Sequence, residues 1–351
     1  MYESDELDVW NLTPGGAARS GAVDIFNVVG RLHNPREVDR VVYELNGAPP
    51  TPVYFIRQRY ESGRLRIPGA FNIDTISLDD LERENRLRFR IIKTNGSTVT
   101  RAVPFRVAPF ADGEPHFTLD LDGVDTAEQV GQVVDGHWRV QQCDNDRSYL
   151  ELTPDDAGYD RIILFGHRNW TTGYEVTARL SITEFQGAHN LGLVYKWNPH
   201  ERGDGTWLPT QWSSGLGYYS SYGPHDGLVI RFGVDADIDD DGQRQGSYVL
   251  ESEPLSKRRR FLNRIGRKLG LVSHLYELDR NRDYWFRMQV HPEQYALTVW
   301  RADRPEPSPQ ITVDQPQEML DHGPVGLLAS QVACRLYDLR VRPVPEEEGS
   351  P

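Results

Sequence analysis

Apolar and polar residues alternate with a period of two along much of the chain. Residues 176–182 and 286–291 alternate without a break, and residues 295–301 form a further apolar-rich run. A period of two places one face of a strand on a core and the other in solvent. Almost nothing has helical periodicity except residues 256–276. The pattern therefore predicts an all-β protein built from half-buried strands.

Strand length divides the chain into two parts. In the first part, short apolar runs are separated by turns such as Asn46-Gly47 and Asn95-Gly96, and Asn-Gly between β-rich runs signals a hairpin. In the second part the runs lengthen. A chain of 351 residues is too long for one typical β-sandwich and long enough for two domains. We expect a flexible arm over 1–20, a β-sandwich over 21–108, a linker over 109–123, a second β-sandwich over 124–345 and a tail over 346–351.

Each of the two parts resembles a known protein family. The second part contains, in order, the runs 170–179, 191–196, 284–288, 297–300, 323–327 and 337–341. This order resembles the concanavalin A-like lectin/glucanase superfamily in its laminin-G-like branch, and the first part resembles bacterial immunoglobulin-like modules. The resemblance implies an Ig-like β-sandwich followed by a concanavalin A-like jelly roll. That superfamily holds lectins, carbohydrate-binding modules, glycoside hydrolases and polysaccharide lyases, so the fold does not decide the activity.

Six aromatic residues crowd a segment rich in Gly, Ser and Pro, namely Trp197, Trp207, Trp212, Tyr218, Tyr219 and Tyr222. Such a composition is typical of loops, and loops carry function more often than cores do. An aromatic ring is a flat apolar plate that matches the C–H face of a sugar. We therefore name these six residues as candidate ligands of a carbohydrate. The alternative is that the rings cover the core beneath a long loop.

Cations occupy the polar phase of two alternating strands, with Arg179 in one and Arg287 in the other. If the two strands share a sheet, its outer face presents guanidinium forks, which bind carboxylates in a bidentate manner. Arg179 and Arg287 are thus candidate ligands of a uronate or a sulfated sugar. The alternative is a solvated outer face without a ligand.

An acidic stretch offers a candidate metal site. Asp237, Asp239, Asp241 and Gly242 stand at positions one, three, five and six of an EF-hand-like calcium loop. The twelfth position is Tyr248 rather than Glu, which excludes a complete EF-hand. We predict that the three aspartates bind Ca²⁺ in a loop of the sandwich, with a solvated acidic loop as the alternative.

A basic segment follows at residues 257–268, which hold seven basic residues and no acidic one. Apolar residues at helical spacing predict a basic amphipathic helix over 257–276. The apolar positions are Phe261, Ile265, Leu269 and Val272. The helix has three alternative partners: the acidic body of the protein itself, another protein, or an anionic membrane surface.

Composition bears on nucleic-acid binding, membrane insertion, secretion and the chemistry of the two cysteines. The net charge of −13 disfavours nucleic-acid binding, and no apolar run approaches the roughly 20 residues of a membrane helix. The acidic start lacks the basic and apolar regions of a secretory signal, so we expect a cytoplasmic protein or one exported by another route. Cys143 and Cys334 lie too far apart in sequence for a zinc motif. They are either two inert residues or a disulfide.

Catalytic motifs give no support for a particular reaction. The chain has no G-x-S-x-G or H-E-x-x-H motif, no phosphate loop and no dinucleotide fingerprint. Glycosidases need two carboxyl groups flanking one bond, and no pair is marked by its spacing. We predict recognition of a polysaccharide, specifically an acidic glycan with calcium assistance. The alternatives are a glycoside hydrolase or polysaccharide lyase on the same fold, and an assembly or surface protein that docks through the basic helix.

Overall fold

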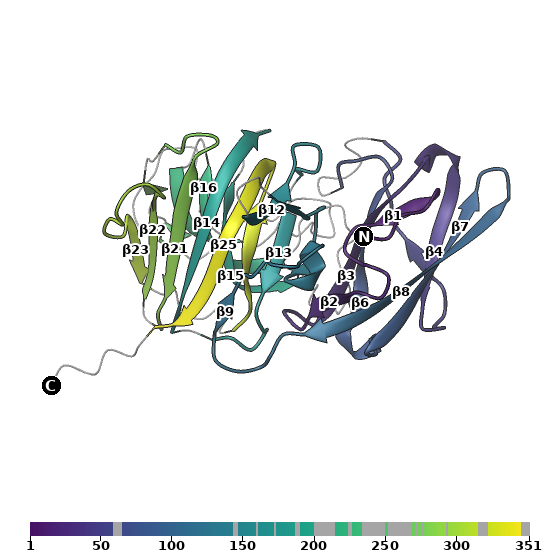
Figure 1. The fold of residues 1–351 in the computed structure, drawn as a ribbon, viewed down its shortest axis with the longest axis horizontal. Coiled ribbons are helices and arrows are strands. Elements are labelled where there is room, and N and C mark those ends of the chain that lie inside the picture. Colours follow the sequence, from purple (N-terminus) through teal and green to yellow (C-terminus); the bar gives the residue numbers. More distant parts are fainter. Residues whose placement is uncertain are drawn as a thin grey trace.

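The computed structural model describes residues 1–58, 65–142, 147–158, 161–171, 173–186, 190–199, 215–223, 227–233, 250–251, 269–270, 273–274, 277–292, 294–314 and 322–344. Its secondary structure is almost entirely strand (Figure 1). The described helices are single 3-10 turns: η1 (Pro35–Glu37), η2 (Leu78–Asp80) and η3 (Ala127–Gln129). No described helix is long and apolar enough to cross a membrane. The all-β prediction is confirmed.

The N-terminal module, residues 1–109, is a β-sandwich of two sheets around one core that contains Phe26, Phe71 and Phe89. One sheet has the order β1 (Leu7–Val9), β3 (Ile25–Leu32), β6 (Ala70–Ser77). The other has the order β2 (Ala17–Ser20), β8 (Thr98–Pro109), β7 (Glu84–Lys93), β4 (Val38–Leu45), β5 (Thr51–Val53). That this sandwich is Ig-like stays a prediction.

Both Asn-Gly pairs close hairpins, as predicted. Asn46 and Gly47 follow β4 with φ angles of 51° and 85°, the left-handed region that such turns require. Asn95-Gly96 connects β7 to β8. The prediction of a loose arm over residues 1–20 is wrong, because these residues supply β1 and β2. Leu7, Val9 and Leu12 are fully buried in the core, and this burial holds the segment in place.

The jelly roll follows, and its two antiparallel sheets enclose the largest core. The seven-stranded sheet has the order β10 (Gln132–Val133), β13 (Arg161–Phe165), β24 (Val325–Ala329), β15 (Leu191–Pro199), β16 (Gly215–Gly223), β17 (Gly227–Gly233), β20 (Ser273–His274). The eight-stranded sheet has the order β11 (Arg139–Gln142), β12 (Ser148–Leu152), β25 (Val332–Pro343), β14 (Tyr174–Phe185), β21 (Asp283–Val290), β22 (Gln294–Arg301), β23 (Ile311–Asp314), with β9 (Phe117–Thr118) beside β25.

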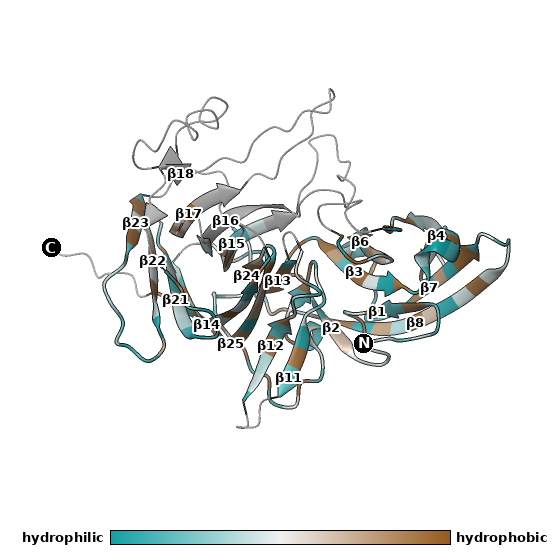
Figure 2. Ribbon diagram, turned by 90° about the horizontal axis from the view of Figure 1, so that it is seen from above, coloured by the Kyte–Doolittle hydropathy of each residue, from teal (hydrophilic) through white to brown (hydrophobic). Residues whose placement is uncertain are grey.

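Each sheet joins hairpins of consecutive strands to strands from distant parts of the chain, as in β14 beside β25, and this order confirms the predicted jelly roll. Apolar residues line the strands of both sandwiches (Figure 2). Two further short strands, β18 (Leu250–Glu251) and β19 (Leu269–Gly270), pair in parallel. The prediction of a helix over 257–276 is wrong for the described parts of this range, because residues 269–270 and 273–274 form strands. Residues 252–268 lie outside the described residues.

The two sandwiches lie side by side along the long axis and share a buried contact (Figure 1). Ala22, Val23 and Ile25 of the N-terminal module pack on the outer side of the seven-stranded sheet, together with Phe110 of the connection. Hydrogen bonds cross the same contact. The Gln132 side chain accepts from the Ala22 N–H at 3.0 Å and donates to the Ile25 carbonyl at 2.7 Å. The N-terminal module therefore covers part of one sheet face of the jelly roll.

Cys334 is a free thiol in the core of the jelly roll, and burial raises its pKa. The disulfide alternative is not what the structure holds, and Cys143 lies outside the described residues. A buried thiol of raised pKa is a poor nucleophile, so we assign Cys334 to packing.

Candidate ligand-binding groove

Strand pairing brings the two arginines predicted from the sequence onto one face. β14 and β21 are neighbours, with Arg179 opposite Trp285 and Thr177 opposite Arg287. Ala178 and Phe286 alternate with them and are buried in the core. Arg179 and Arg287 therefore both point away from the core, on the outer face of the eight-stranded sheet.

Both guanidinium groups already have acid partners. Arg179 bonds to Asp283 and lies 4.0 Å from the Asp338 carboxylate. Arg287 bonds to Glu306 at 2.6 Å. Their side chains are only 19% and 23% exposed. An acidic ligand would have to displace these carboxylates. The two guanidinium groups therefore contribute to the structure of this face and supply little free charge to a ligand.

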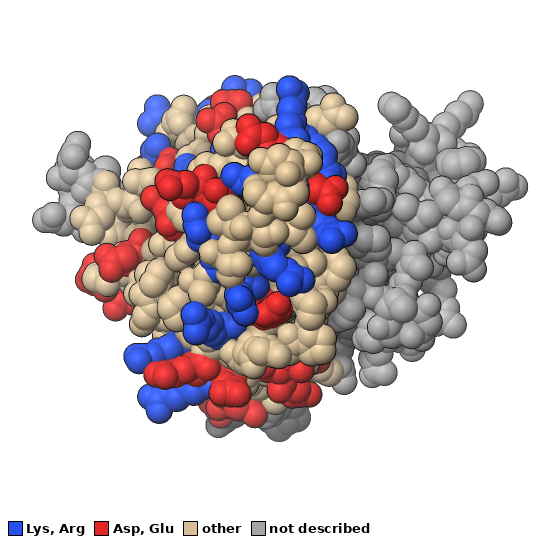
Figure 3. All heavy atoms as spheres, turned by 90° about the vertical axis from the view of Figure 1, so that its right-hand side faces the viewer, with Lys and Arg blue, Asp and Glu red and all other residues tan. Residues whose placement is uncertain are grey.

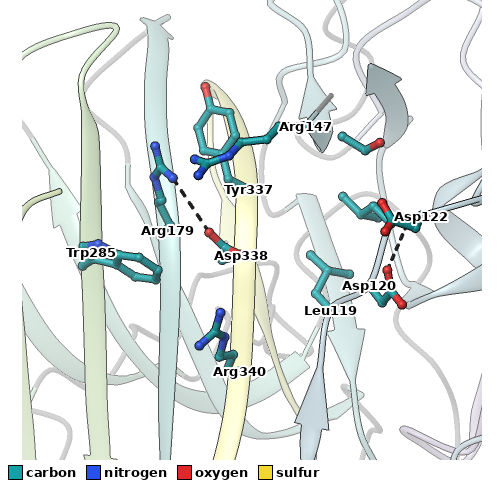
Figure 4. A pocket seen from close by; sticks show the side chains of 11 residues that line it. Leu119, Asp120, Asp122, Arg147, Arg179, Trp285, Tyr337, Asp338 and Arg340 are labelled. Atoms are coloured by element: carbon teal, nitrogen blue, oxygen red, sulfur yellow. Dashed lines mark hydrogen bonds and ion pairs between the residues drawn. The ribbon is translucent and has the colours of Figure 1, made fainter. Parts of the chain in front are cut away.

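A hollow of about 400 Å³ opens on this face (Figure 4). Its floor comes from β14, β21 and β25, and its walls come from the connection before η3 and the β11–β12 turn. We call this hollow the groove, and its lining residues are Leu119, Asp120, Leu121, Asp122, Arg147, Ser148, Arg179, Trp285, Tyr337, Asp338 and Arg340. Trp207 and Trp212, by contrast, lie outside the described residues.

Two aromatic rings, Trp285 and Tyr337, line the groove, and both are half-buried. The Arg179 guanidinium lies over the Tyr337 ring, with 5.3 Å between its carbon and the ring centroid. The Tyr337 hydroxyl is 3.2 Å from the Ser181 hydroxyl. These contacts hold the tyrosine ring in place and set polar groups beside it.

Arg147 and Arg340 are the free cations of the groove. Both are exposed, and neither has an ion pair within the described part of the chain. In Figure 4 Arg147 points toward β25 from the β11–β12 turn, while Arg340 lies further along β25. Asp120 also lines the groove, from the connection before η3, where its carboxylate accepts the Asp122 N–H at 3.0 Å. The groove thus offers donors and acceptors around an aromatic floor.

Two rings of the predicted aromatic cluster have no free face. Trp197 is fully buried, in the contact between the seven-stranded sheet and the N-terminal module. Tyr222 is buried in the jelly-roll core, and its hydroxyl accepts the Leu278 N–H at 3.3 Å. We therefore leave both out of the proposed site. Tyr218 and Tyr219 lie in β16, and their side chains are outside the described residues.

The candidate calcium ligands Asp237, Asp239 and Asp241 also lie outside the described residues. Within the ranges that the structure describes, no group of three or more His, Cys, Asp or Glu residues is arranged to hold a metal ion. Calcium binding by the acidic loop therefore stays a prediction.

Sequence reasoning missed Trp285 and Tyr337, although a signal for the first was present. Trp285 has the same phase as Arg287 in an alternating strand, so its outward direction follows from the pattern. Arg147 and the loop at Asp120 gave no such signal. They reach the groove because β12 and β9 both pair with β25, which lies about 200 residues later in the chain.

A second polar cluster lies beneath the N-terminal module. Arg161 bonds to Asp135 at 2.7 Å, Arg139 bonds to Asp156 at 3.0 Å, and the His137 ring stacks under Trp10 with 4.7 Å between centroids. Burial, and then the charge of Arg139, lowers the pKa of His137 to about 3. Burial raises the pKa of Asp156. The adjoining hollow is only about 10 Å³, which leaves no room for a ligand.

The exposed face of the N-terminal module carries interspersed charges (Figure 3). On its five-stranded sheet Arg88 pairs with Glu44 at 3.6 Å and Arg106 pairs with Glu84 at 3.0 Å. Charges of both signs are typical of a solvated surface. We therefore place the candidate site in the groove of the jelly roll.

No protein-family model matches the chain, and no curated protein is recognisably similar in sequence. Solved structures of similar fold were found. The exoplasmic/lumenal domain of VIP36 in its Ca²⁺/Man3GlcNAc-bound form has 12% identity and a TM-score of 0.36, covering 60% of this chain and 85% of its own. The carbohydrate-binding module CBM66 from Bacillus subtilis has 11% identity and a TM-score of 0.33, covering 60% and 92%.

A Bacillus subtilis protein of unknown function with a galectin-like fold has 11% identity and a TM-score of 0.37, covering 67% of this chain and 98% of its own. Likenesses at these identities concern the arrangement of strands.

Proposed function

We propose that the chain recognises a carbohydrate in the groove on the outer face of the eight-stranded sheet. The observation that carries the proposal is the pairing of an aromatic floor, Trp285 and Tyr337, with two arginines that lack acid partners among the described residues, Arg147 and Arg340. A sugar ring has an apolar C–H face and polar edges. An aromatic plate bordered by fixed donors and acceptors is complementary to both.

The free arginines favour an acidic glycan within this class. A guanidinium binds a carboxylate or a sulfate through two parallel hydrogen bonds, and the groove supplies two such groups in a chain whose net charge is −13. The carboxylates of Asp120 and Asp338 would accept hydrogen bonds from sugar hydroxyls. Calcium assistance through the loop at 237–241 belongs to the same proposal and has a separate test.

A glycoside hydrolase is the second candidate, because three carboxyl groups line the groove: Asp120, Asp122 and Asp338. A general acid on a glycosidase has a raised pKa. The described carboxyl group whose pKa is raised is Asp156, which lies under the N-terminal module and not in the groove. Asp338 is already engaged by the Arg179 guanidinium, which lies 4.0 Å from its carboxylate. Both observations favour binding over cleavage.

A glycan array tests the proposal directly. The full chain is applied to neutral, uronate-containing and sulfated glycans with and without Ca²⁺, and each bound glycan is recovered and sized. We expect retention of an acidic glycan at unchanged length, and shortened products would support the hydrolase instead. Arg340→Ala is the test variant. Arg86→Ala is its control, since Arg86 is an exposed arginine of the N-terminal module that has no ion pair with a described residue.

A further inference from the structure

A row of planar side chains crosses five adjacent strands on the outer face of the eight-stranded sheet. The row consists of Tyr149 on β12, Tyr337 on β25, Arg179 on β14, Trp285 on β21 and Trp300 on β22. The two tyrosine centroids are 5.5 Å apart, and the Arg179 carbon lies 5.3 Å from the Tyr337 ring. Trp285 and Trp300 stack at 6.3 Å with 24° between their planes. Only the central members of this row line the groove.

Strand register produces the row. Arg179 is the direct partner of Trp285, and Trp285 is the direct partner of Trp300. On the other side the β14–β25 register shifts at Arg179, so that Arg179 pairs with Asp338 and Leu180 with Leu336. Tyr337 is the extra residue of this bulge. Because a bulge redirects a side chain, Tyr337 faces outward together with Asp338.

The surface continues beyond the groove on the far side of Arg179. A second hollow of about 360 Å³ is lined by Asn281, Arg282, Asp283, Arg301, Ala302 and Asp303, and Arg179 lines both hollows. Arg282 is exposed and has no ion pair among the described residues. Arg301 is bound to Asp303 at 2.7 Å. The two hollows meet at Arg179, and each carries at least one free arginine.

We infer that this face takes an internal stretch of an acidic polysaccharide lying across the strands, rather than a single terminal sugar. The inference rests on the proposed function. Four spacings between five strands amount to about 19 Å, which is longer than any monosaccharide. The row offers one ring pair at each end, Tyr149 with Tyr337 and Trp285 with Trp300, and the Arg179 guanidinium between them. A single sugar can cover one ring pair only.

The consequence is that affinity depends on chain length. A short oligomer stacks on one ring pair, and a longer one reaches the second pair without a second loss of rotational and translational freedom. Removing a ring at either end should therefore weaken binding of the polymer but leave binding of the shortest oligomers almost unchanged. Removing Trp285, which lines the groove itself, should weaken both.

Affinity electrophoresis tests this with defined probes. The full chain is run in gels that contain polygalacturonate, heparin or a neutral β-glucan, and retardation is competed with galacturonate oligomers of increasing length. We expect retardation by at least one anionic polymer. If polygalacturonate retards the protein, we expect long galacturonate oligomers to compete at least about tenfold better than the monomer. If heparin retards it, heparin fragments of graded size serve as the competitors.

Ring variants separate the inference from the function. Trp300→Ala and Tyr149→Ala should each weaken retardation about tenfold, the scale of losing a partly buried ring, while Trp300→Phe restores most of it. Tyr54→Ala is the control, because Tyr54 is an exposed ring on the N-terminal module. Each variant is checked for an unchanged melting temperature.

The outcomes are distinct. If Trp285→Ala abolishes retardation while Trp300→Ala and Tyr149→Ala behave as the parent, and the shortest oligomer competes as well as the longest, the site takes one sugar. The inference then fails and the proposed function stands. If the parent is not retarded by any of the three polymers, the proposed function and the inference fail together.

Discussion

Arg179 lies directly opposite Trp285 across the β14–β21 pair, and the carboxylates of Asp283 and Asp338 flank its guanidinium. The acids fix the direction of the arginine and neutralise its charge. Arg179 therefore acts as a planar spacer between Trp285 and Tyr337 rather than as a free cation. The charge available to a ligand comes from Arg147 and Arg340 at the edges of the groove.

Trp285→Ala should weaken binding of every glycan that fits the groove, whatever its charge. The ring supplies apolar area that no neighbour replaces, and we expect a loss of about 1–3 kcal/mol in binding free energy, the scale of a large apolar side chain. Isothermal titration with a glycan identified on the array measures the change. Trp285→Phe should recover about half of the loss, and equal affinity of the parent and the alanine variant would remove Trp285 from the site.

Arg340→Ala should act on acidic glycans alone. Arg340 is exposed, so we expect roughly a threefold loss of affinity at low salt, as for an exposed ion pair. The difference from the parent should shrink as ionic strength rises, because exposed charges are screened over about 10 Å at 0.1 M salt. Titrations at two salt concentrations measure it. An equal loss for a neutral glycan would indicate a packing role.

Calcium should raise the melting temperature if Asp237, Asp239 and Asp241 bind it, because a ligand that binds only the folded state stabilises it by mass action. Changing all three residues to Asn should abolish the rise without altering the melting temperature in EDTA. Differential scanning fluorimetry with Ca²⁺, Mg²⁺ and EDTA makes the comparison. The absence of any calcium-dependent rise in the parent protein would count against the site.

His137 should make the protein less stable in acid. Its pKa is lowered from 6.5 to about 3 in the folded state, so below pH 6.5 the unfolded chain takes up a proton that the folded chain does not. Stability should therefore decrease as the pH falls from about 6.5 toward about 3, by a few kcal/mol at about 1.4 kcal/mol per pKa unit.

The groups that face His137 modify this profile. The Arg139 cation and the N-terminal ammonium disfavour protonation of His137. Asp156, whose own pKa is raised, gains a proton on folding and offsets part of the loss in the acid range. Asp135 is held by Arg161. His137→Gln should flatten the dependence of urea unfolding on pH between 6.5 and 4, whereas the exposed control His116→Gln should keep the parent slope. Identical slopes for all three proteins would refute the assignment.

Asn72 should matter for the contact between the two sandwiches. Its amide donates to the Val134 carbonyl at 2.8 Å and its oxygen accepts from Asn27 at 3.0 Å, all in buried positions. Asn72→Ala removes both of these buried hydrogen bonds, so we expect a loss of about 1–3 kcal/mol in the free energy of unfolding. Asn169→Ala is the control, since that side chain bonds to Asp112 at the surface. Equal stability of both variants would mean that water replaces the Asn72 bonds.

Alternation along residues 176–182 and 286–291 was enough to determine which side of each strand faces the core. The pleat of the backbone fixes this within the strand itself, so the outward direction of Arg179 and Arg287 and the all-β class follow from local pattern. The two Asn-Gly hairpins are local in the same sense, because each turn depends on a positive φ at its own glycine, 85° at Gly47 and 81° at Gly96.

Tertiary structure alone decided what those side chains meet. The acids that neutralise Arg179 and Arg287, and the bulge that turns Tyr337 outward, depend on strand order in the sheet, where β14 lies between β25 and β21, both far from it in sequence. Trp197 looked like a ligand for a sugar and is buried, because the N-terminal module covers that side of the seven-stranded sheet. Residues 1–20 looked like a loose arm and supply two strands, because their few apolar side chains find a core elsewhere in the chain. Contacts of this kind arise from long-range pairing, which the period of a local pattern does not encode.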